Sequence, residues 1–214
     1  MIVVLLLLAA ASAFERRASG PAAGAARAGK SACTCAAYRP LFAEYGGPLG
    51  IPVSFMCALA CRESRCNPSS QDGPAWGLMQ IVEVVRRSIA RQGGAASSRY
   101  TRPELLQPRV SVYLAVQTMR NVLRAFAQVG EPAQWKNPRW VGLFVAGWNA
   151  GYSLKAGVAG VVRWLKARGL AATVENVHAY GRQAGAVEWI WKHPHRLTWW
   201  RSVVDKYREL GGFS

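Results

Sequence analysis

Glu63 is the residue of this chain whose position most suggests chemistry, because it ends an otherwise apolar helical stripe. The stripe follows the spacing of one helix face and consists of Pro52, Phe55, Met56, Leu59, Ala60 and Glu63. Proline suits the first turn of a helix, and Asn67-Pro68 predicts that the helix stops soon after Glu63. The sequence therefore predicts a helix that carries a carboxyl group at its C-terminal end.

The surroundings expected for Glu63 should raise the pKa of its carboxyl group. Apolar neighbours disfavour the charged form, and the C-terminal end of a helix dipole does not stabilise an anion. A carboxyl group that keeps its proton near neutral pH can donate it to a leaving oxygen, as a general acid does. The alternative interpretation is an exposed acid beyond the end of a core helix, and the periodicity alone leaves both open.

The residues from Glu63 to Ile81 also carry a recognisable pattern. Glu63-Ser64, Asn67-Pro68 and Gly77-Leu78-Met79-Gln80-Ile81 resemble the first signature of the soluble lytic transglycosylases, a branch of the lysozyme-like fold. The resemblance implies a mainly α-helical domain with a catalytic cleft, in which Glu63 is the catalytic acid and base. It also implies that Ser64, Gly77, Met79 and Gln80 line the sugar-binding cleft. The spacing from Glu63 to Gly77 is one residue shorter than the common family pattern.

A second match lies in Ala146-Gly147-Trp148-Asn149-Ala150-Gly151, which resembles the Ala-Tyr-Asn-Ala-Gly signature of the same family. The resemblance implies that Trp148 and Asn149 border the substrate, with Trp148 offering a stacking face but no hydroxyl. The Asn149 amide can both donate to and accept from a sugar, although Asn-Ala-Gly is also a common helix end. Tyr180 is the candidate for the late tyrosine that hydrogen-bonds near the acid in this family.

The resemblance implies cleavage of the bond between N-acetylmuramic acid and N-acetylglucosamine in peptidoglycan, without metal or cofactor. One glutamate would act twice and leave a 1,6-anhydro end, whereas a hydrolytic glycosidase usually needs two carboxylates. Asp72 is the nearby candidate for a second carboxylate, so a muramidase of the goose-lysozyme kind is the first alternative. The second alternative is a non-cleaving wall-binding component of a secretion, conjugation or phage apparatus.

The balance of charges predicts an anionic partner for this chain of 214 residues. Lys and Arg number 27 and Asp and Glu number 11, which gives a net charge of +16. No basic recognition helix, zinc finger or RNP-like motif is present, so nucleic acid is not expected as the partner. Wall polymers, the acidic peptide stems of peptidoglycan and, as peripheral contact, lipid headgroups would supply the same attraction.

The N-terminal region is expected to direct export. Residues 1–13 form a short apolar run that ends in Ala11-Ser12-Ala13, as a signal peptide does, and 14–36 are predicted to be a flexible linker. The expected location is the bacterial periplasm or envelope. Exported cysteines form disulfides, and the five here predict one or two bridges with one thiol left over and no assigned pairing: Cys33, Cys35, Cys57, Cys61 and Cys66. A zinc site is the alternative, although their spacing matches no common finger.

Helical periodicity continues through the rest of the chain and predicts a lysozyme-like domain over 37–184. Helices are expected within 38–50, 82–91, 105–126, 138–149 and 158–169, while 69–75 is expected to be a loop. The remaining 185–214 are predicted to be a Trp-rich extension in which Leu197, Trp200, Val204 and Tyr207 form the face of a docking helix.

Overall fold

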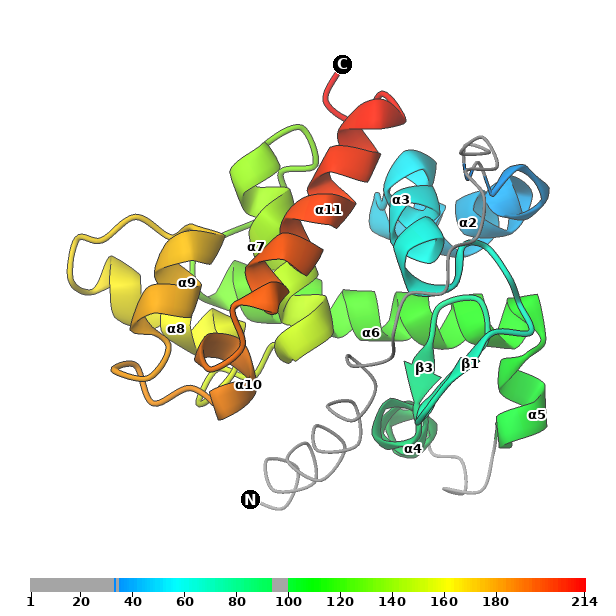
Figure 1. Ribbon diagram of the computed structural model, residues 1–214, viewed down its shortest axis with the longest axis horizontal. Helices are drawn as coiled ribbons and strands as arrows, with labels where there is room; N and C mark the ends of the chain where they lie inside the picture. Colours follow the sequence, from blue (N-terminus) through cyan, green and yellow to red (C-terminus); the bar gives the residue numbers. More distant parts are fainter. Residues whose placement is uncertain (1–32, 34, 94–99) are drawn as a thin grey trace, which may run out of the picture.

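The computed structural model describes residues 33, 35–93 and 100–214. This part of the chain is mainly helical, as the sequence predicts, and Figure 1 shows the arrangement of its elements. The α-helices are α2 (Arg39–Gly46), α3 (Val53–Ser64), α4 (Glu83–Gln92), α5 (Arg102–Leu105), α6 (Pro108–Gln128), α7 (Pro138–Ala150), α8 (Val158–Lys166), α9 (Val174–Tyr180), α10 (Glu188–Trp191) and α11 (His195–Glu209). The predicted signal peptide, most of the predicted linker and the cleavage site lie outside the described residues.

Helix α6 is the longest element and crosses the molecule (Figure 1). Helix α6 contacts α2, α4 and α5, and it also contacts α7. The seven apolar residues that predicted this helix are nearly all buried, because that stripe faces elements on both sides of α6. The buried members are Val112, Ala115, Val116, Met119, Val122 and Phe126. Helix α6 therefore joins the half that contains α3 to the half that contains α7, α8 and α9.

The segment between α3 and α4 forms a small antiparallel sheet, whereas the sequence predicted a loop over 69–75. Its strands are β1 (Gln71–Asp72), β2 (Ala75–Trp76) and β3 (Ile81–Val82), in the order β1-β2-β3. Gln71 pairs with Trp76, and Trp76 pairs with Ile81. Strands of two residues carry no period that a sequence could display, so the loop prediction was wrong for a physical reason.

Helix α3 is buried on nearly all sides. Four members of the predicted stripe are buried, namely Phe55, Met56, Leu59 and Ala60, while its two end members are partly buried. Cys57 and Ala58, which lie outside that stripe, are buried as well. The reason is that α2 covers one side of α3 while α11 covers another. The helix that carries Glu63 is therefore enclosed by elements from both ends of the described chain (Figure 1).

The C-terminal residues pack onto the domain, which confirms the predicted docking helix. Helix α11 contacts α3, α7 and α9. Trp200, Val203 and Tyr207 are almost completely buried, and Phe55 of α3 packs edge-on against Tyr207 with ring centroids 5.7 Å apart. The boundary predicted at residue 185 stays a prediction, but α11 contributes directly to the core around α3.

None of the described helices combines the length and the apolar character that crossing a bilayer requires.

Candidate active site

Glu63 lies one residue before the end of α3, where the sequence predicted it. The helix stops because Arg65 and Cys66 adopt left-handed backbone conformations, with φ of 55° and 59°. The backbone N–H of Cys66 donates to the carbonyl of Ala60 at 3.2 Å, which closes the helix end in the Schellman manner. Two successive non-glycine residues in this region are unfavourable, so other contacts must hold the turn.

Four cysteines supply those contacts on both sides of Glu63. Cys33 pairs with Cys61, and Cys35 pairs with Cys66, with Cα–Cα distances of 5.8 and 5.4 Å. Two pairs with one thiol left over are what the sequence predicted, and the remaining thiol is the fully buried Cys57. The same four sulfurs lie within 4.8 Å of one another, so this cluster is also where the zinc alternative would place its metal. Either chemistry ties Cys33 and Cys35 to the end of the helix that carries Glu63.

The carboxyl group of Glu63 receives a hydrogen bond from the other half of the molecule. Trp148 Nε1 donates to Glu63 Oε1 at 2.8 Å, across 85 residues of sequence. Burial raises the pKa of Glu63 to about 7, while the bond from Trp148 and the positive charges of Arg62 and Arg196 act in the opposite direction. Near neutral pH the carboxyl group is therefore able both to give and to take a proton.

This raised pKa predicts a pH-dependent difference in stability between the wild type and Glu63→Gln. The unfolded chain ionises Glu63 near pH 4.5, whereas the folded protein keeps the proton to about pH 7, so the folded state binds more protons between these values. The contribution of Glu63 to the free energy of unfolding is fully present below pH 4.5 and is lost as pH rises through 7. Between pH 4 and pH 8 the free energy of unfolding of the Gln variant should therefore rise by about 2 to 3 kcal/mol relative to that of the wild type. Urea unfolding of both proteins across this range measures it, and a difference that does not change with pH would contradict it.

The segment 77–80 packs against the end of α3 through several of the residues predicted to bind substrate. The Ser64 hydroxyl donates to the Leu78 carbonyl at 2.8 Å, and the Gln80 amide donates to the Gly77 carbonyl at 2.8 Å. The backbone N–H of Met79 donates to the Ser111 hydroxyl of α6 at 3.0 Å. Ser64 and the Met79 side chain are buried, so in this structure they hold the loop in place, and their contact with substrate stays a prediction.

Asn149 lies next to Trp148 on α7, and its side-chain oxygen is held by α11. Arg196 Nη1 and Trp200 Nε1 donate to Asn149 Oδ1 at 3.1 and 3.2 Å. The sequence predicted an amide that both donates to and accepts from a sugar. In the structure the acceptor oxygen is used within the protein, which leaves the NH₂ group for a ligand.

Tyr180 lies at the end of α9, away from the contacts just described. Its ring packs against Trp164 of α8 with centroids 6.0 Å apart. Among the described residues no hydrogen bond joins Tyr180 to Glu63, so its predicted role near the acid stays a prediction. The structure thus brings Glu63, Trp148 and Asn149 together and leaves Tyr180 outside this group.

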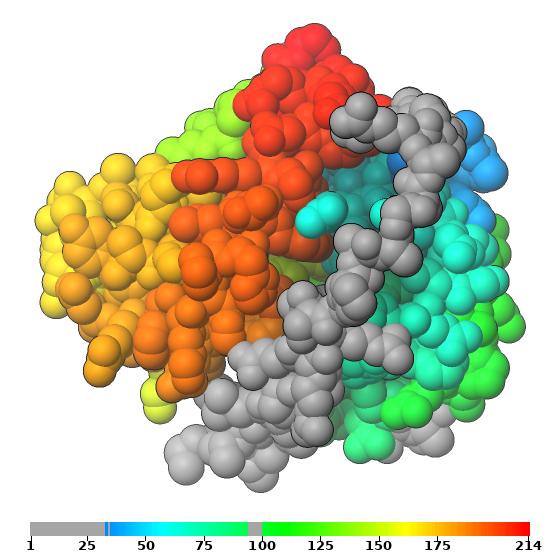
Figure 2. Space-filling model, viewed as in Figure 1, coloured from blue at the N-terminus to red at the C-terminus, as the bar shows by residue number. Residues whose placement is uncertain are grey.

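The surface around Glu63 is formed by segments from both ends of the described chain. Figure 2 shows α10 and α11, in orange and red, beside the cyan residues of α3 and the small sheet, with the surface hollowed where they meet. A pocket of about 310 Å³ lies just beyond the second signature and includes Tyr152, Ser153 and Leu154 in its lining. The lining extends from these residues, which follow Asn149 in the sequence, across α6 to Gln92 at the end of α4.

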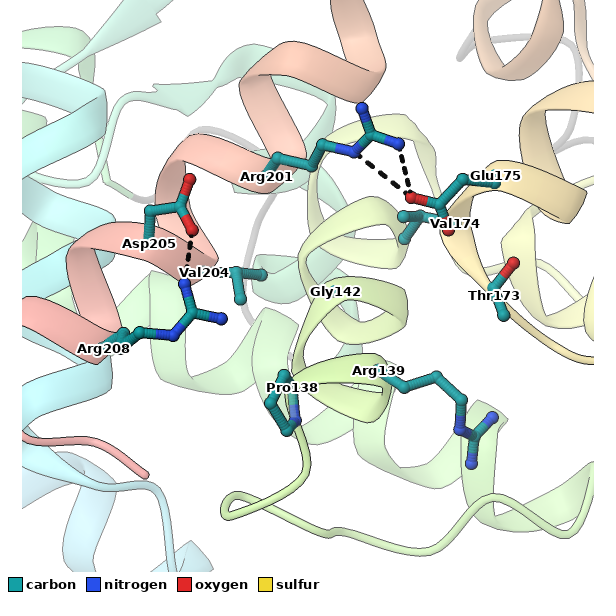
Figure 3. A pocket seen from close by; sticks show the side chains of 10 residues that line it. All are labelled: Pro138, Arg139, Gly142, Thr173, Val174, Glu175, Arg201, Val204, Asp205 and Arg208. Atoms are coloured by element: carbon teal, nitrogen blue, oxygen red, sulfur yellow. Dashed lines mark hydrogen bonds and ion pairs between the residues drawn. The ribbon is translucent and has the colours of Figure 1, made fainter. Parts of the chain in front are cut away.

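A second pocket, of about 270 Å³, lies between α7, α9 and α11 (Figure 3). Each of its charged groups has an ion-pair partner. Arg201 bonds Glu175 and Arg208 bonds Asp205, each at 2.7 Å, while Arg139 bonds Glu131 outside the pocket at 2.9 Å. Neither Glu63 nor any other residue of the two signatures that was predicted to bind substrate lines this pocket. Its position and its paired charges separate it from the candidate active site.

The sequence did not predict Arg196 as a residue of the site. The tail was predicted to dock, and α11 does dock, but the same helix also carries Arg196, which is 3% exposed to solvent and donates to Asn149. The pattern of tryptophans beside a cation was visible in the sequence. It contained no signal that the arginine would be buried, because burial of α11 depends on the surface of α3 and α7.

Comparison with known proteins agrees with this geometry. A search of curated protein sequences finds no match to the chain. The profile described as "Transglycosylase SLT domain" matches residues 40–171, which is more than half of the chain and includes Glu63, the segment 77–81 and Asn149. The match supports peptidoglycan as the substrate class and the lysozyme-like helical fold. The chain therefore belongs to the transglycosylase SLT domain family.

Proposed function

We propose that this protein is a lytic transglycosylase that cleaves the β-1,4 bond between N-acetylmuramic acid and N-acetylglucosamine. Glu63 acts as the general acid and then as the base. The observation that carries the proposal is the position of Glu63, whose pKa near 7 suits both tasks and whose carboxyl group is oriented by the Trp148 N–H.

The reaction uses one carboxyl group twice and needs no water. Protonated Glu63 donates to the glycosidic oxygen as the bond to C1 of the muramic acid breaks. The resulting carboxylate takes the proton of the C6 hydroxyl of the same sugar, and that oxygen bonds to C1. The products are a 1,6-anhydro end and a free 4-hydroxyl, and Glu63 is protonated again.

The electrostatic surroundings of Glu63 favour this route over hydrolysis. The charged groups that act on it within the described chain are the cations Arg62 and Arg196, and no carboxylate is among them. A hydrolytic glycosidase places two carboxyl groups on either side of the scissile bond. Asp72, the candidate for the second group, lies exposed on β1 and takes no part in the hydrogen bond that orients Glu63.

Mass spectrometry of muropeptides tests the proposal. Purified peptidoglycan digested with the protein should yield products one water lighter than reducing-end muropeptides, and Asp72→Asn should give the same products at a similar rate. Reducing-end products that disappear in Asp72→Asn would establish the muramidase instead. Tight binding to peptidoglycan with neither product would support the non-cleaving wall-binding component.

Because peptidoglycan lies outside the cytoplasmic membrane, this function requires export, and we include export in the proposal. The apolar run 1–13 and the expected disulfides support it. The net charge of +16 would attract the protein to an anionic wall.

A further inference from the structure

The orientation of the Asn149 amide is determined by two groups of α11 that can only donate. Arg196 Nη1 and Trp200 Nε1 both lie within hydrogen-bond distance of the same Asn149 atom, at 3.1 and 3.2 Å. A guanidinium and an indole N–H have no acceptor, so this atom must be the amide oxygen. The amide nitrogen makes no hydrogen bond with any described residue, so it remains available to donate to a ligand.

Arg196 is itself held in place by its surroundings. It is 3% exposed, and its guanidinium carbon lies 3.4 Å from the centre of the Trp189 ring, which is a close stacking contact. Burial lowers the pKa of Arg196 to about 10, and the charge of Glu63 acts to raise it. The guanidinium therefore remains charged at neutral pH and acts electrostatically on the carboxyl group.

These contacts come from a part of the chain outside the family match. The match ends at residue 171, whereas Trp189, Arg196 and Trp200 follow it. The two signatures alone thus leave Asn149 without the partners that set its orientation.

We propose that Arg196 is a positioning residue of the candidate active site: with Trp200 it orients Asn149 so that an NH₂ group faces the substrate, and it places a cation beside Glu63. This inference rests on the proposed function. Asn149 then recognises an acceptor atom of the glycan, such as the carbonyl oxygen of an N-acetyl group. The cation stabilises the carboxylate that exists between the two proton transfers.

Arg196 has two proposed roles, which are to orient Asn149 and to place a positive charge beside Glu63. Three variants of the full chain distinguish these roles. Trp200→Phe removes one donor to Asn149 but keeps a large ring and the charge of Arg196. Arg196→Lys keeps the charge and loses the planar group. Arg196→Met removes the charge and keeps the length of the side chain. Arg201→Met is the matched control, because Arg201 lies on the same helix but pairs with Glu175 in the pocket shown in Figure 3.

Release of anhydro-muropeptides from soluble glycan strands, measured as kcat and KM across pH 5 to 9, is the readout. We expect Arg196→Met to lower kcat/KM about 10- to 100-fold, and Trp200→Phe to raise KM about 3- to 10-fold. The charged groups acting on Glu63 are Arg62 of α3 and Arg196 of α11, while Trp148 of α7 is a neutral donor. Loss of Arg196 should therefore raise the pKa of Glu63 and move the alkaline limb of the pH profile to higher pH. Arg196→Lys and Trp200→Phe should leave that limb in place.

The outcomes separate this inference from the proposed function. A wild type that makes no anhydro product overturns the proposed function. A second result is that the wild type makes the anhydro product while Arg196→Met keeps a kcat/KM within threefold of that of Arg201→Met and the alkaline limb of the wild type. That result overturns the positioning role alone. If these residues served only for packing, every variant would have a lower maximum in its pH profile and an unmoved alkaline limb. That result also contradicts the proposal. If Arg196→Met fails to fold, Trp200→Phe decides it, since an unchanged KM in that folded variant overturns the orientation of Asn149 by α11.

Discussion

Glu63→Gln is expected to lower the rate of anhydro-muropeptide release by at least about 10³-fold while leaving the fold intact. The amide keeps an oxygen that can accept from Trp148 Nε1, so the packing at the end of α3 is retained. It has no proton to give to the glycosidic oxygen and cannot take one from the C6 hydroxyl. Both steps assigned to one group are therefore lost in a single substitution.

The measurement is the quantity of anhydro products per enzyme and time, with circular dichroism to confirm the fold. Glu175→Gln is the matched control, because it removes an exposed carboxylate that pairs with Arg201 and is not among the groups that act on Glu63. That variant should keep the wild-type rate. A Glu63→Gln protein that retains more than about a tenth of the wild-type rate would rule out Glu63 as the acid and base.

Gly77→Ala is expected to lower the free energy of unfolding by about 3 to 5 kcal/mol. Gly77 has φ of +80°, and an added Cβ would lie 2.0 Å from the backbone carbonyl oxygen of Leu105, at the end of α5. Backbone atoms cannot turn aside as a flexible side chain can, so the loop and α5 must separate. That movement would also strain the bond from Met79 to Ser111 and the bond from Ser64 to Leu78.

Urea denaturation compares this variant with Gly73→Ala. Gly73 also has a positive φ, of +55°, but an added Cβ there has open space around it. The control therefore measures the backbone conformational cost alone, which is about 1 to 2 kcal/mol. Equal losses in the two variants would show that the close approach of Gly77 to Leu105 is not important for stability.

Most helices of the fold could be predicted from the sequence, because each buries an apolar face of several turns. The helices expected within 82–91, 105–126, 138–149 and 158–169 correspond to α4, α6, α7 and α8. The small sheet could not be predicted, because its pairing of Gln71 with Trp76 depends on how 77–81 is anchored to Ser64 and Ser111.

The candidate site was predictable only in part. The two signatures identified Glu63, Trp148 and Asn149, which the structure brings together. The stacking face expected of Trp148 stays a prediction, and the sequence did not predict the hydrogen bond from its indole N–H to Glu63. The position of Tyr180 beside Trp164 was not visible in the sequence, because it depends on how α9 packs onto α8.

The sequence by itself determined the family, the helical fold class and the place of Glu63, the candidate acid, at the end of a helix. These depend on local spacing and on motifs that lie within one or two segments. Only the tertiary structure decided that α11 covers α3 and that Arg196 reaches Asn149, 47 residues away in sequence. The physical reason is that burial and hydrogen bonding of Arg196 depend on surfaces contributed by other elements, and no periodicity within residues 195–209 reports those surfaces.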